Sequence, residues 1–289
     1  MSWHLGRLCA FDLETTSVDP EDARIVQAYA GLVGGGLEPV DVCDLVVDPG
    51  IPVPHEAQRI HGLTTEYVRE HGDPADAAVD IIVSAVASAL LEGVPLVGHN
   101  VRYDLTVLGR ECRRHGLPTL EDRVDGLVGP VLDTQVLSKH VDQYRRKSTE
   151  INPATGEPYG AQQLRTCAIA FNVGWSDEDA HGARYDALTA ARIAWRIGQI
   201  AGLPLRDRPR AQGRELVRFN HVMVPLARLH QAQEQWAREQ DAGWAAYFRE
   251  QAEKTADVDE QIEFHRRAES CTGHWPVYPF AAEQQGQLA

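Results

Sequence analysis

The chain has 289 residues, of which 43% are hydrophobic and 24% charged, and this composition excludes wholesale disorder. Its length allows one main domain with an appended extension. The formal net charge of −14 argues against a protein that coats DNA tightly, because such binding relies on many Lys and Arg side chains. We find neither an apolar run of membrane-spanning length nor a secretory signal, and therefore expect a cytoplasmic protein with no membrane partner.

Three strand-like segments open the chain. Residues 8–13 form a short, largely apolar run, and residues 25–33 and 40–47 are further strand candidates. A polar turn follows the first segment, and three glycines at positions 34–36 separate the second from the third. The pattern predicts a three-stranded antiparallel meander.

From residue 75 onward, helical and strand-like segments alternate. The helical segments are 75–91, 102–115, 161–171 and 183–200, and the short buried strands are 95–98 and 131–133. A meander followed by strands that are linked through helices predicts an α/β fold. We expect a mixed five-stranded sheet with helices on both faces.

A change of composition divides the chain near its last third. Prolines, a glycine and several arginines mark residues 204–221 as a linker. We therefore expect one domain over residues 1–203 and a helical C-terminal extension over residues 222–289. The main helix of the extension runs from Pro225, which suits a first helical turn, to about residue 253.

Three aromatic side chains lie near one side of that helix: Trp236, Trp244 and Phe248. Aromatic side chains stack on the bases of single-stranded nucleic acids, so base stacking is one interpretation of this stripe. Packing against the rest of the protein is the other, and the helical spacing favours packing.

Two acids on the first predicted strand are the first candidates for metal ligands. Asp12 and Glu14 are two residues apart, so both side chains leave the same face of a strand. Like charges at this range repel each other unless a cation lies between them, and Mg²⁺ prefers oxygen ligands of this kind. For the doublet alone, a solvated acid pair beside a turn is the alternative.

Two further acids stand near predicted helix starts. Asp104 follows a buried strand, and Asp186 lies close to the start of the helix at 183–200. Taken singly, each acid could simply interact favourably with the dipole of its helix. Four acids in this order and context favour a shared site instead.

The segments FDLETT, GHNVRYD and HGARYD resemble the three motifs of the DEDDh exonucleases, the DnaQ-like family that includes the proofreading epsilon subunit of bacterial DNA polymerase III. The resemblance runs from about residue 7 to residue 200. It implies a ribonuclease H-like fold and a metal-dependent 3′→5′ exonuclease. The catalytic residues that it implies are Asp12, Glu14, Asp104, His181 and Asp186. A sister class has tyrosine where Gly182 stands here, so the histidine class fits.

The resemblance also implies a set of residues that contact the last nucleotides of the strand. These are Thr15, Thr16, Ile60, His61 and Asn100. One departure from the family pattern is Ser17, where glycine is frequent; we expect a different turn there and no effect on metal binding. The neighbouring His99 is expected to be a core histidine.

The implied cofactors are two divalent ions, Mg²⁺ or Mn²⁺. We expect Asp12 to be shared by both ions, Glu14 and Asp186 to complete the ligands of one, and Asp104 to hold the other. His181 would act as general base, because an ordinary histidine is largely neutral near pH 7 and able to take a proton. The reaction rate is then expected to rise with pH through the neutral range.

The expected substrate is a single nucleic-acid strand with a free 3′ end, DNA in preference to RNA, and the products are nucleoside 5′-monophosphates. An exoribonuclease of the same fold is one alternative, because the same metal chemistry serves both sugars. A polymerase-associated proofreading or binding subunit is another. For the C-terminal helices, the open alternatives are formation of a homodimer and binding to a DNA polymerase.

Overall fold

The computed structural model describes residues 2–153 and 155–280. Its centre is a mixed sheet with the strand order β4-β3-β2-β1-β5-β6. The strands are β1 (Arg7–Thr15), β2 (Ile25–Gly34), β3 (Val40–Asp48), β4 (Asp73–Pro74), β5 (Leu96–Gly98) and β6 (Val131–Asp133). The predicted meander is confirmed, since β1 pairs with β2 and β2 with β3 in antiparallel register. Strands β5 and β6 then extend the sheet in parallel from β1.

The sheet has six strands and not the predicted five. The additional strand is β4, which pairs in parallel with the end of β3. It has two residues, both exposed, and its proline directly precedes a helix. A strand this short carries no alternation of apolar and polar side chains, so the sequence pattern could not reveal it.

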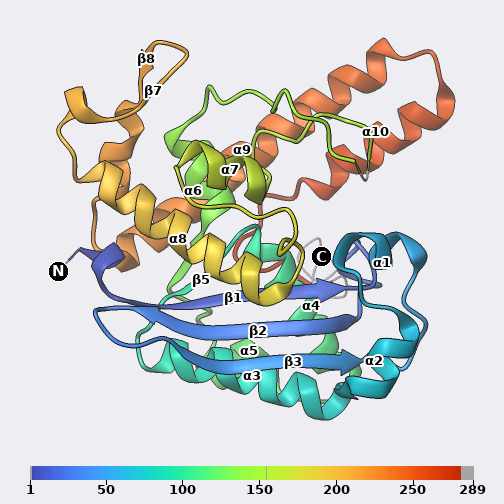
Figure 1. Cartoon of the computed structure of the whole chain (residues 1–289). Coiled ribbons are helices and arrows are strands. Elements are labelled where there is room, and N and C mark those ends of the chain that lie inside the picture. Colours follow the sequence, from blue (N-terminus) through green and yellow to red (C-terminus); the bar gives the residue numbers. More distant parts are fainter. Residues whose placement is uncertain (1, 154, 281–289) are drawn as a thin grey trace, which may run out of the picture.

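Helices cover both faces of the sheet, as predicted (Figure 1). Helix α8 lies across one face, and α3 and α4 lie on the other. The helices are α1 (His55–His61), α2 (Thr65–His71), α3 (Ala75–Leu91), α4 (Val101–Arg114), α5 (Leu120–Arg123), α6 (Thr134–Val141), α7 (Leu164–Ala170), α8 (Ala183–Ala201), α9 (Leu226–Lys254) and α10 (Val258–Ser270). The 3₁₀ segments are η1 (Trp3–Leu5), η2 (Leu205–Asp207) and η3 (Val217–Val222), and a small hairpin comprises β7 (Arg210–Ala211) and β8 (Arg214–Glu215).

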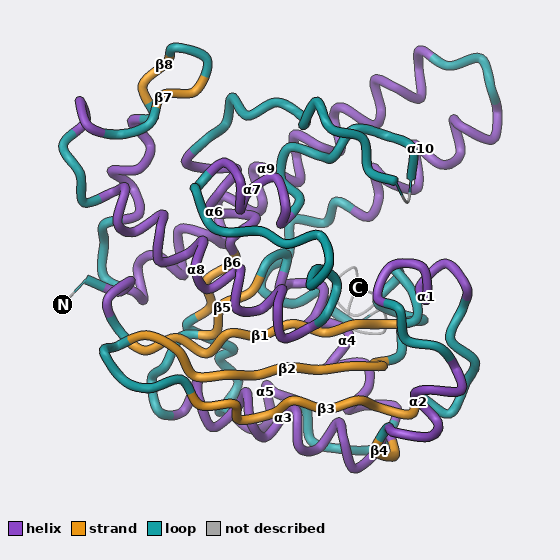
Figure 2. The backbone as a smooth tube through the Cα atoms, viewed as in Figure 1, coloured by secondary structure: helices purple, strands orange, loops and turns teal. Residues whose placement is uncertain are grey.

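The long helices match their predicted bounds closely, and the short helix α7 was predicted, but the other short helices were missed. The segment predicted as helical from residue 161 becomes helical only at Leu164. Helices α1, α2, α5 and α6 have between four and eight residues, too few for apolar periodicity to separate them from loops. In Figure 2 these helices are the short purple segments labelled α1, α2, α5 and α6. None of the helices in the described part of the chain is both long and apolar enough to cross a bilayer.

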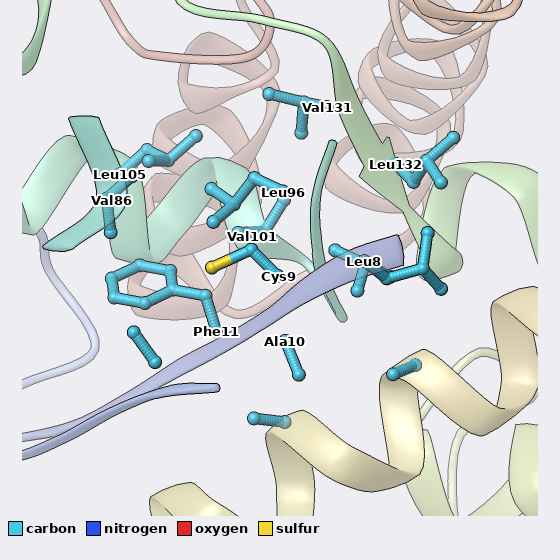
Figure 3. Close-up of a cluster of buried hydrophobic side chains, with 14 of the residues drawn as sticks. Leu8, Cys9, Ala10, Phe11, Val86, Leu96, Val101, Leu105, Val131 and Leu132 are labelled. Carbon is cyan, nitrogen blue, oxygen red and sulfur yellow. The ribbon is translucent and has the colours of Figure 1, made fainter. Parts of the chain in front are cut away.

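Strand β1 is buried on both faces, which explains its nearly continuous apolar sequence. Figure 3 shows Phe11 and Cys9 among side chains of β5, α3 and α4, including Leu96, Val86 and Leu105. Burial of this kind contributes roughly 1.5–3 kcal/mol for each large aliphatic or aromatic side chain. The core therefore fixes β1, and with it the acids on that strand.

A glycine lets the start of α4 approach β1 closely. A Cβ at Gly98 would lie 2.8 Å from Val101 Cβ and 2.9 Å from the carbonyl oxygen of Phe11. No side chain fits in this space without displacement of the backbone. Gly98 thereby allows the first turn of α4, which carries Asp104, to lie against β1.

The C-terminal part packs onto the same core. Phe219, inside the segment predicted as a linker, and Val222, the first residue of the predicted extension, are fully buried. The Trp3 indole N–H donates to the Val222 carbonyl at 2.7 Å. Helix α9 covers the outer edge of β6: the Gln233 side chain donates to the Val131 carbonyl at 2.9 Å and accepts from the Asp133 N–H at 2.8 Å. The amide therefore replaces a neighbouring strand at this edge. The predicted division at residues 203 and 222 stays a prediction.

Candidate active site

Three carboxylates from two elements meet at one end of the sheet. Asp12 and Glu14 leave the same face of β1, and Asp186 comes from the first turn of α8. One oxygen of each lies within 4.8 Å of the others. These distances suit oxygen ligands that share divalent cations.

The fourth acid approaches from the opposite face. Asp104 lies in the first turn of α4, is 4% exposed, and its Oδ1 accepts a hydrogen bond from the Leu13 N–H at 3.2 Å. Leu13 stands between the two acids of β1, so this bond holds Asp104 beside them. The structure thus brings together all four acids that the sequence singled out, although only three belong to the tightest group.

Burial raises the pKa of every acid in this cluster, and repulsion by other acids adds to the shift for Asp12, Glu14 and Asp104. Burial is the largest cause for Asp12, and the charges of the other three acids add to it. For Glu14 the causes are burial and then Asp186 and Asp104. Burial raises the pKa of Asp104 to about 8, against hydrogen bonds that lower it, and the pKa of Asp186 to about 7. Without a counter-charge, this arrangement destabilises the ionised protein.

The donor set fits divalent cations. All four side chains offer carboxylate oxygens, which hard cations prefer. The Asp186 Oδ1 atom is buried and has no hydrogen-bond partner in the described part of the chain. A buried oxygen without a donor is costly, and a cation would satisfy it.

His181 stands at the rim of the acidic cluster. It adopts a left-handed conformation (φ +64°) one residue before Gly182, the N-cap of α8. A backbone hydrogen bond from His181 lowers the pKa of Asp186. Partial desolvation lowers the pKa of His181 itself, and Asp177 opposes that shift. The ring is exposed, so it can reach a bound substrate.

The start of α8 is held on the sheet by a residue that the sequence analysis missed. The Gln27 side chain on β2 accepts a hydrogen bond from the Ala183 N–H at 3.2 Å. Gln27 lies opposite Glu14 in the strand register. A polar residue within the apolar run of β2 was the available signal.

The turn after β1 is closed by a second missed residue. The Tyr103 hydroxyl lies 2.6 Å from Thr15 Oγ1 and also donates to the Ser17 carbonyl. Thr16 Oγ1 accepts from the Arg24 N–H at 3.0 Å. Both threonines are therefore fixed at the C-terminal end of β1, next to the acids.

Helix α1 carries the segment expected to meet the last bases, and it lies beside the end of β1 (Figure 1). Ile60 is 46% exposed. His61 is half-buried: its Nδ1 accepts from the Leu63 N–H at 3.1 Å, while Nε2 is buried without a hydrogen-bond partner among the described residues. Thr15 and His181 both affect the pKa of His61, which places its ring near the rim of the cluster.

Asn100 caps α4 in a left-handed conformation (φ +61°), and its N–H donates to Asp133 Oδ1 at 3.0 Å. Asp133 is a third missed residue: it ends β6, caps α6, and its charge raises the pKa of Asp104. His99 lies between Thr134 Oγ1 and the Gln162 carbonyl, each at 2.8 Å. This agrees with the core role expected for His99.

A family model described as an exonuclease matches residues 9–194. The chain belongs to this exonuclease family. All three motifs and the four converging acids lie within the matched range, and the resemblance to the DnaQ-like exonucleases is confirmed. Helix α9, which covers the edge of β6, lies beyond the matched range.

Curated relatives share the exonuclease region. A DNA polymerase III subunit epsilon-like protein of Rhodobacter capsulatus is 34% identical over 130 residues, which cover 44% of this chain and 16% of the relative. A PolC-type DNA polymerase III of Lacticaseibacillus paracasei is 27% identical over 136 residues, which cover 47% of this chain and 8% of the relative. The exonuclease chain thus matches only a small part of the length of these relatives.

Solved structures show the same fold. Escherichia coli exonuclease I in complex with a dA16 oligonucleotide superposes with a TM-score of 0.53 at 18% identity, covering 67% of this chain and 41% of the other. Exonuclease I from Methylocaldum szegediense gives a TM-score of 0.50 at 19% identity, covering 67% and 40%. The ribonuclease H-like fold of the exonuclease chain is therefore established.

Proposed function

We propose that this exonuclease removes nucleotides from the 3′ end of single-stranded DNA and releases nucleoside 5′-monophosphates. The observation that carries the proposal is the convergence of Asp12, Glu14, Asp104 and Asp186 beside an exposed histidine. Phosphodiester hydrolysis requires a deprotonated water and stabilisation of charge on the phosphoryl oxygens. Four carboxylates cannot supply that stabilisation by themselves.

Bound divalent cations would neutralise the negative charge of the acids and so allow an anionic substrate to bind beside them. Asp12, Glu14 and Asp186 would hold one ion and Asp12 with Asp104 a second, Mg²⁺ or Mn²⁺ in each case. When bound, the ions supply positive charge to the phosphoryl oxygens and lower the pKa of water. The raised pKa values of the four acids and the partnerless Asp186 oxygen support this assignment.

His181 is the proposed general base. Its pKa is lowered by partial desolvation, so the imidazole is neutral at pH 7 and can accept a proton from the attacking water. His181 directly precedes the N-cap of α8, and its backbone forms a hydrogen bond to Asp186. Its ring forms no hydrogen bond to the residues that the structure describes, so the ring is free to act on a water molecule.

The direction of cutting would come from one closed end of the site. The turn held by Tyr103 fixes Thr15 and Thr16 at the end of β1, and α1 adds Ile60 and His61. A strand whose last sugar lies against these residues cannot continue past them. This supports recognition of a terminal 3′-hydroxyl.

Three substrates of matched sequence test the direction: a 5′-labelled linear oligonucleotide with a 3′-hydroxyl, the same one with a 3′-phosphate, and a circle that carries its label internally. We expect a ladder that shortens from the 3′ end only for the first. Rapid loss of the circle would refute the closed end. Matched DNA and RNA oligonucleotides then separate the proposed function from an exoribonuclease.

Association with a polymerase is the second candidate, and the names of the relatives favour it. Mass measurement in solution of the full chain, alone and mixed with a replicative polymerase, tests this candidate together with the proposed homodimer. A monomer that degrades DNA but does not bind polymerase would exclude both the polymerase-associated subunit and the homodimer, and would support an enzyme that acts alone.

A further inference from the structure

A cleft of about 180 Å³, partly open to solvent, lies between α4, α6 and α9. Asn100 and Asp133 line its inner wall, and Trp244 and Lys139 line its outer part. Asn100, whose N–H donates to Asp133 at 3.0 Å, is the N-cap of α4, and the first turn of that helix carries Asp104, so the cleft lies next to the acidic cluster. Its outer wall on α9 lies beyond residue 194, where the match to the exonuclease family ends.

We infer that this cleft binds a nucleotide of the substrate strand upstream of the scissile bond, with its base at Trp244 and its phosphate at Lys139. The inference rests on the proposed function and adds to it a binding site formed by the C-terminal extension. The aromatic stripe then divides: Trp236 is buried and stacks on His140 at 3.6 Å, whereas Trp244 is 43% exposed.

The polar groups of the cleft suit a nucleotide. The Lys139 ammonium lies 4.1 Å from the centre of the Trp244 ring and has no carboxylate within salt-bridge distance in the described part of the chain. The ammonium group can pair with the phosphate of a nucleotide, and the neighbouring indole can stack on its base. The side-chain amides of Asn100 and Gln135 also line the cleft, and neither forms a hydrogen bond to the residues that the structure describes. These amides can form hydrogen bonds with the polar edge of a base.

The cleft is formed before any substrate binds. Arg102 at the start of α4 makes a bidentate contact with Asp241 of α9, at 2.8 and 3.3 Å, with both side chains nearly buried. The Gly273 N–H donates to the same carboxylate at 2.9 Å. Asp133, the acid of the inner wall, has its charge offset by N–H groups of Asn100 and Gln135. Neither acid therefore presents an uncompensated charge to a phosphate.

The position of the cleft relative to the acids determines which part of the substrate strand can bind in the cleft. The end of β1 and α1 lie on one side of the acids, where the terminal nucleotide is proposed to lie. The cleft opens on the α6 and α9 side, so a strand that continues from the site towards its 5′ end enters it. Short substrates cannot reach Trp244, and longer ones can.

The experiment compares Trp244→Ala with Trp195→Ala in the full-length protein. Trp195 lies on α8 in a different groove and is equally exposed, at 44%. Activity is measured on a thymidine oligonucleotide and on the p-nitrophenyl ester of thymidine 5′-monophosphate, which occupies only the acidic site. Stacking of a base on an aromatic side chain predicts a KM for the oligonucleotide that is about tenfold higher in Trp244→Ala. The ratio of oligonucleotide to ester activity should fall by the same factor.

Two further variants complete the test. Trp244→Phe should recover most of the affinity, because a ring remains. Lys139→Gln should reduce the slope of log KM against log salt by about 0.7, the value for one phosphate contact on a single strand. An equal KM in Trp244→Ala and Trp195→Ala, or an equal loss on both substrates, would overturn the inference. A wild-type protein that degrades neither substrate would instead remove the proposed function itself.

Discussion

At the scale of single residues, the acidic cluster makes the metal-free protein sensitive to pH. Carboxylates with raised pKa values stabilise the fold fully only below their unfolded values, near 4, and that stability is lost as pH rises through the folded values. Those values are about 7 for Asp186 and about 8 for Asp104. In chelator, the free energy of unfolding should therefore fall between pH 5 and pH 9 by at least ~1 kcal/mol, or roughly 2–4 °C in Tm.

Thermal unfolding across this pH range, with chelator and with Mg²⁺, checks the prediction. Added Mg²⁺ should raise the Tm most at high pH, where the acids are ionised and repel each other. A metal-free Tm that rises from pH 5 to pH 9 would show that the acids do not repel each other as the structure indicates.

The role proposed for His181 is proton transfer and not metal binding, so loss of its side chain should spare metal binding. We expect His181→Ala to lower kcat by about 10²–10⁴-fold, the usual contribution of a general base. Because the pKa of His181 is lowered from 6.5, the rise of the wild-type rate with pH should lie on the acidic side of 6.5. The rise through the neutral range that the sequence suggested stays a prediction, and the pH profile decides where the rise lies.

The measurements are kcat against pH and the Mg²⁺-induced change in Tm. The Tm change should be the same in wild type and variant. Near-full activity of His181→Ala, or the same acidic limb in both proteins, would remove His181 from this role.

The sequence predicted the residues of the site better than the residues that hold them in position. Asp12, Glu14, Asp104, His181 and Asp186 stand in motifs whose spacing can be recognised. Gln27, Tyr103 and Asp133 act through hydrogen bonds between segments far apart in the chain, and a single sequence does not show which segments will be neighbours. Their signal was weak: one polar side chain in or at the end of an apolar run.

At the scale of elements, the position of α8 decides whether Asp186 meets the acids of β1. Gln27→Ala removes the side chain that accepts from the first N–H of that helix. We expect a loss of stability of about 1 kcal/mol, the usual net value of a hydrogen bond. Small displacements of a catalytic group are expensive, so kcat should fall on the order of 10–10²-fold.

Urea unfolding and kcat measurement test this prediction beside Gln235→Ala, which removes an exposed glutamine from α9. The control should change neither quantity. If Gln27→Ala were fully active, α8 would be held in place by its buried apolar face alone.

At the scale of the whole molecule, the C-terminal extension is joined to the exonuclease core by more than a chain connection. Gln233 is fully buried and forms two hydrogen bonds to the edge of β6. Its replacement by alanine leaves the Val131 carbonyl and the Asp133 N–H buried without these partners, at a cost of about 1–3 kcal/mol each. Gln233→Ala should therefore destabilise the entire protein.

Urea unfolding followed by two probes, intrinsic fluorescence and circular dichroism, checks this prediction. Gln231→Ala on the exposed side of α9 is the matched control and should leave the midpoint unchanged. We expect one transition that moves to lower urea in Gln233→Ala. Two transitions, of which only one moves, would support the predicted division into a domain over residues 1–203 and a separate extension over residues 222–289.

That division shows why the sequence predicted the elements of the extension but not their packing. The composition of residues 204–221 is typical of a linker, yet Phe219 and the adjoining Val222 are fully buried in the 3₁₀ segment η3, which packs against α8. Burial of single apolar residues in and beside a polar, proline-rich stretch leaves no periodic pattern. The fold of the first 200 residues, in contrast, follows from long periodic segments and three motifs.

In the proposed mechanism, four acids that are distant in sequence act together through divalent cations on the end of a DNA strand. Incubation of 5′-labelled single-stranded DNA with the intact protein or with Asp12→Asn, in Mg²⁺ or in chelator, tests this mechanism. We expect a ladder that shortens from the 3′ end only for the intact protein with Mg²⁺. An equal ladder in chelator, or from Asp12→Asn, would show that the four acids do not act through bound cations.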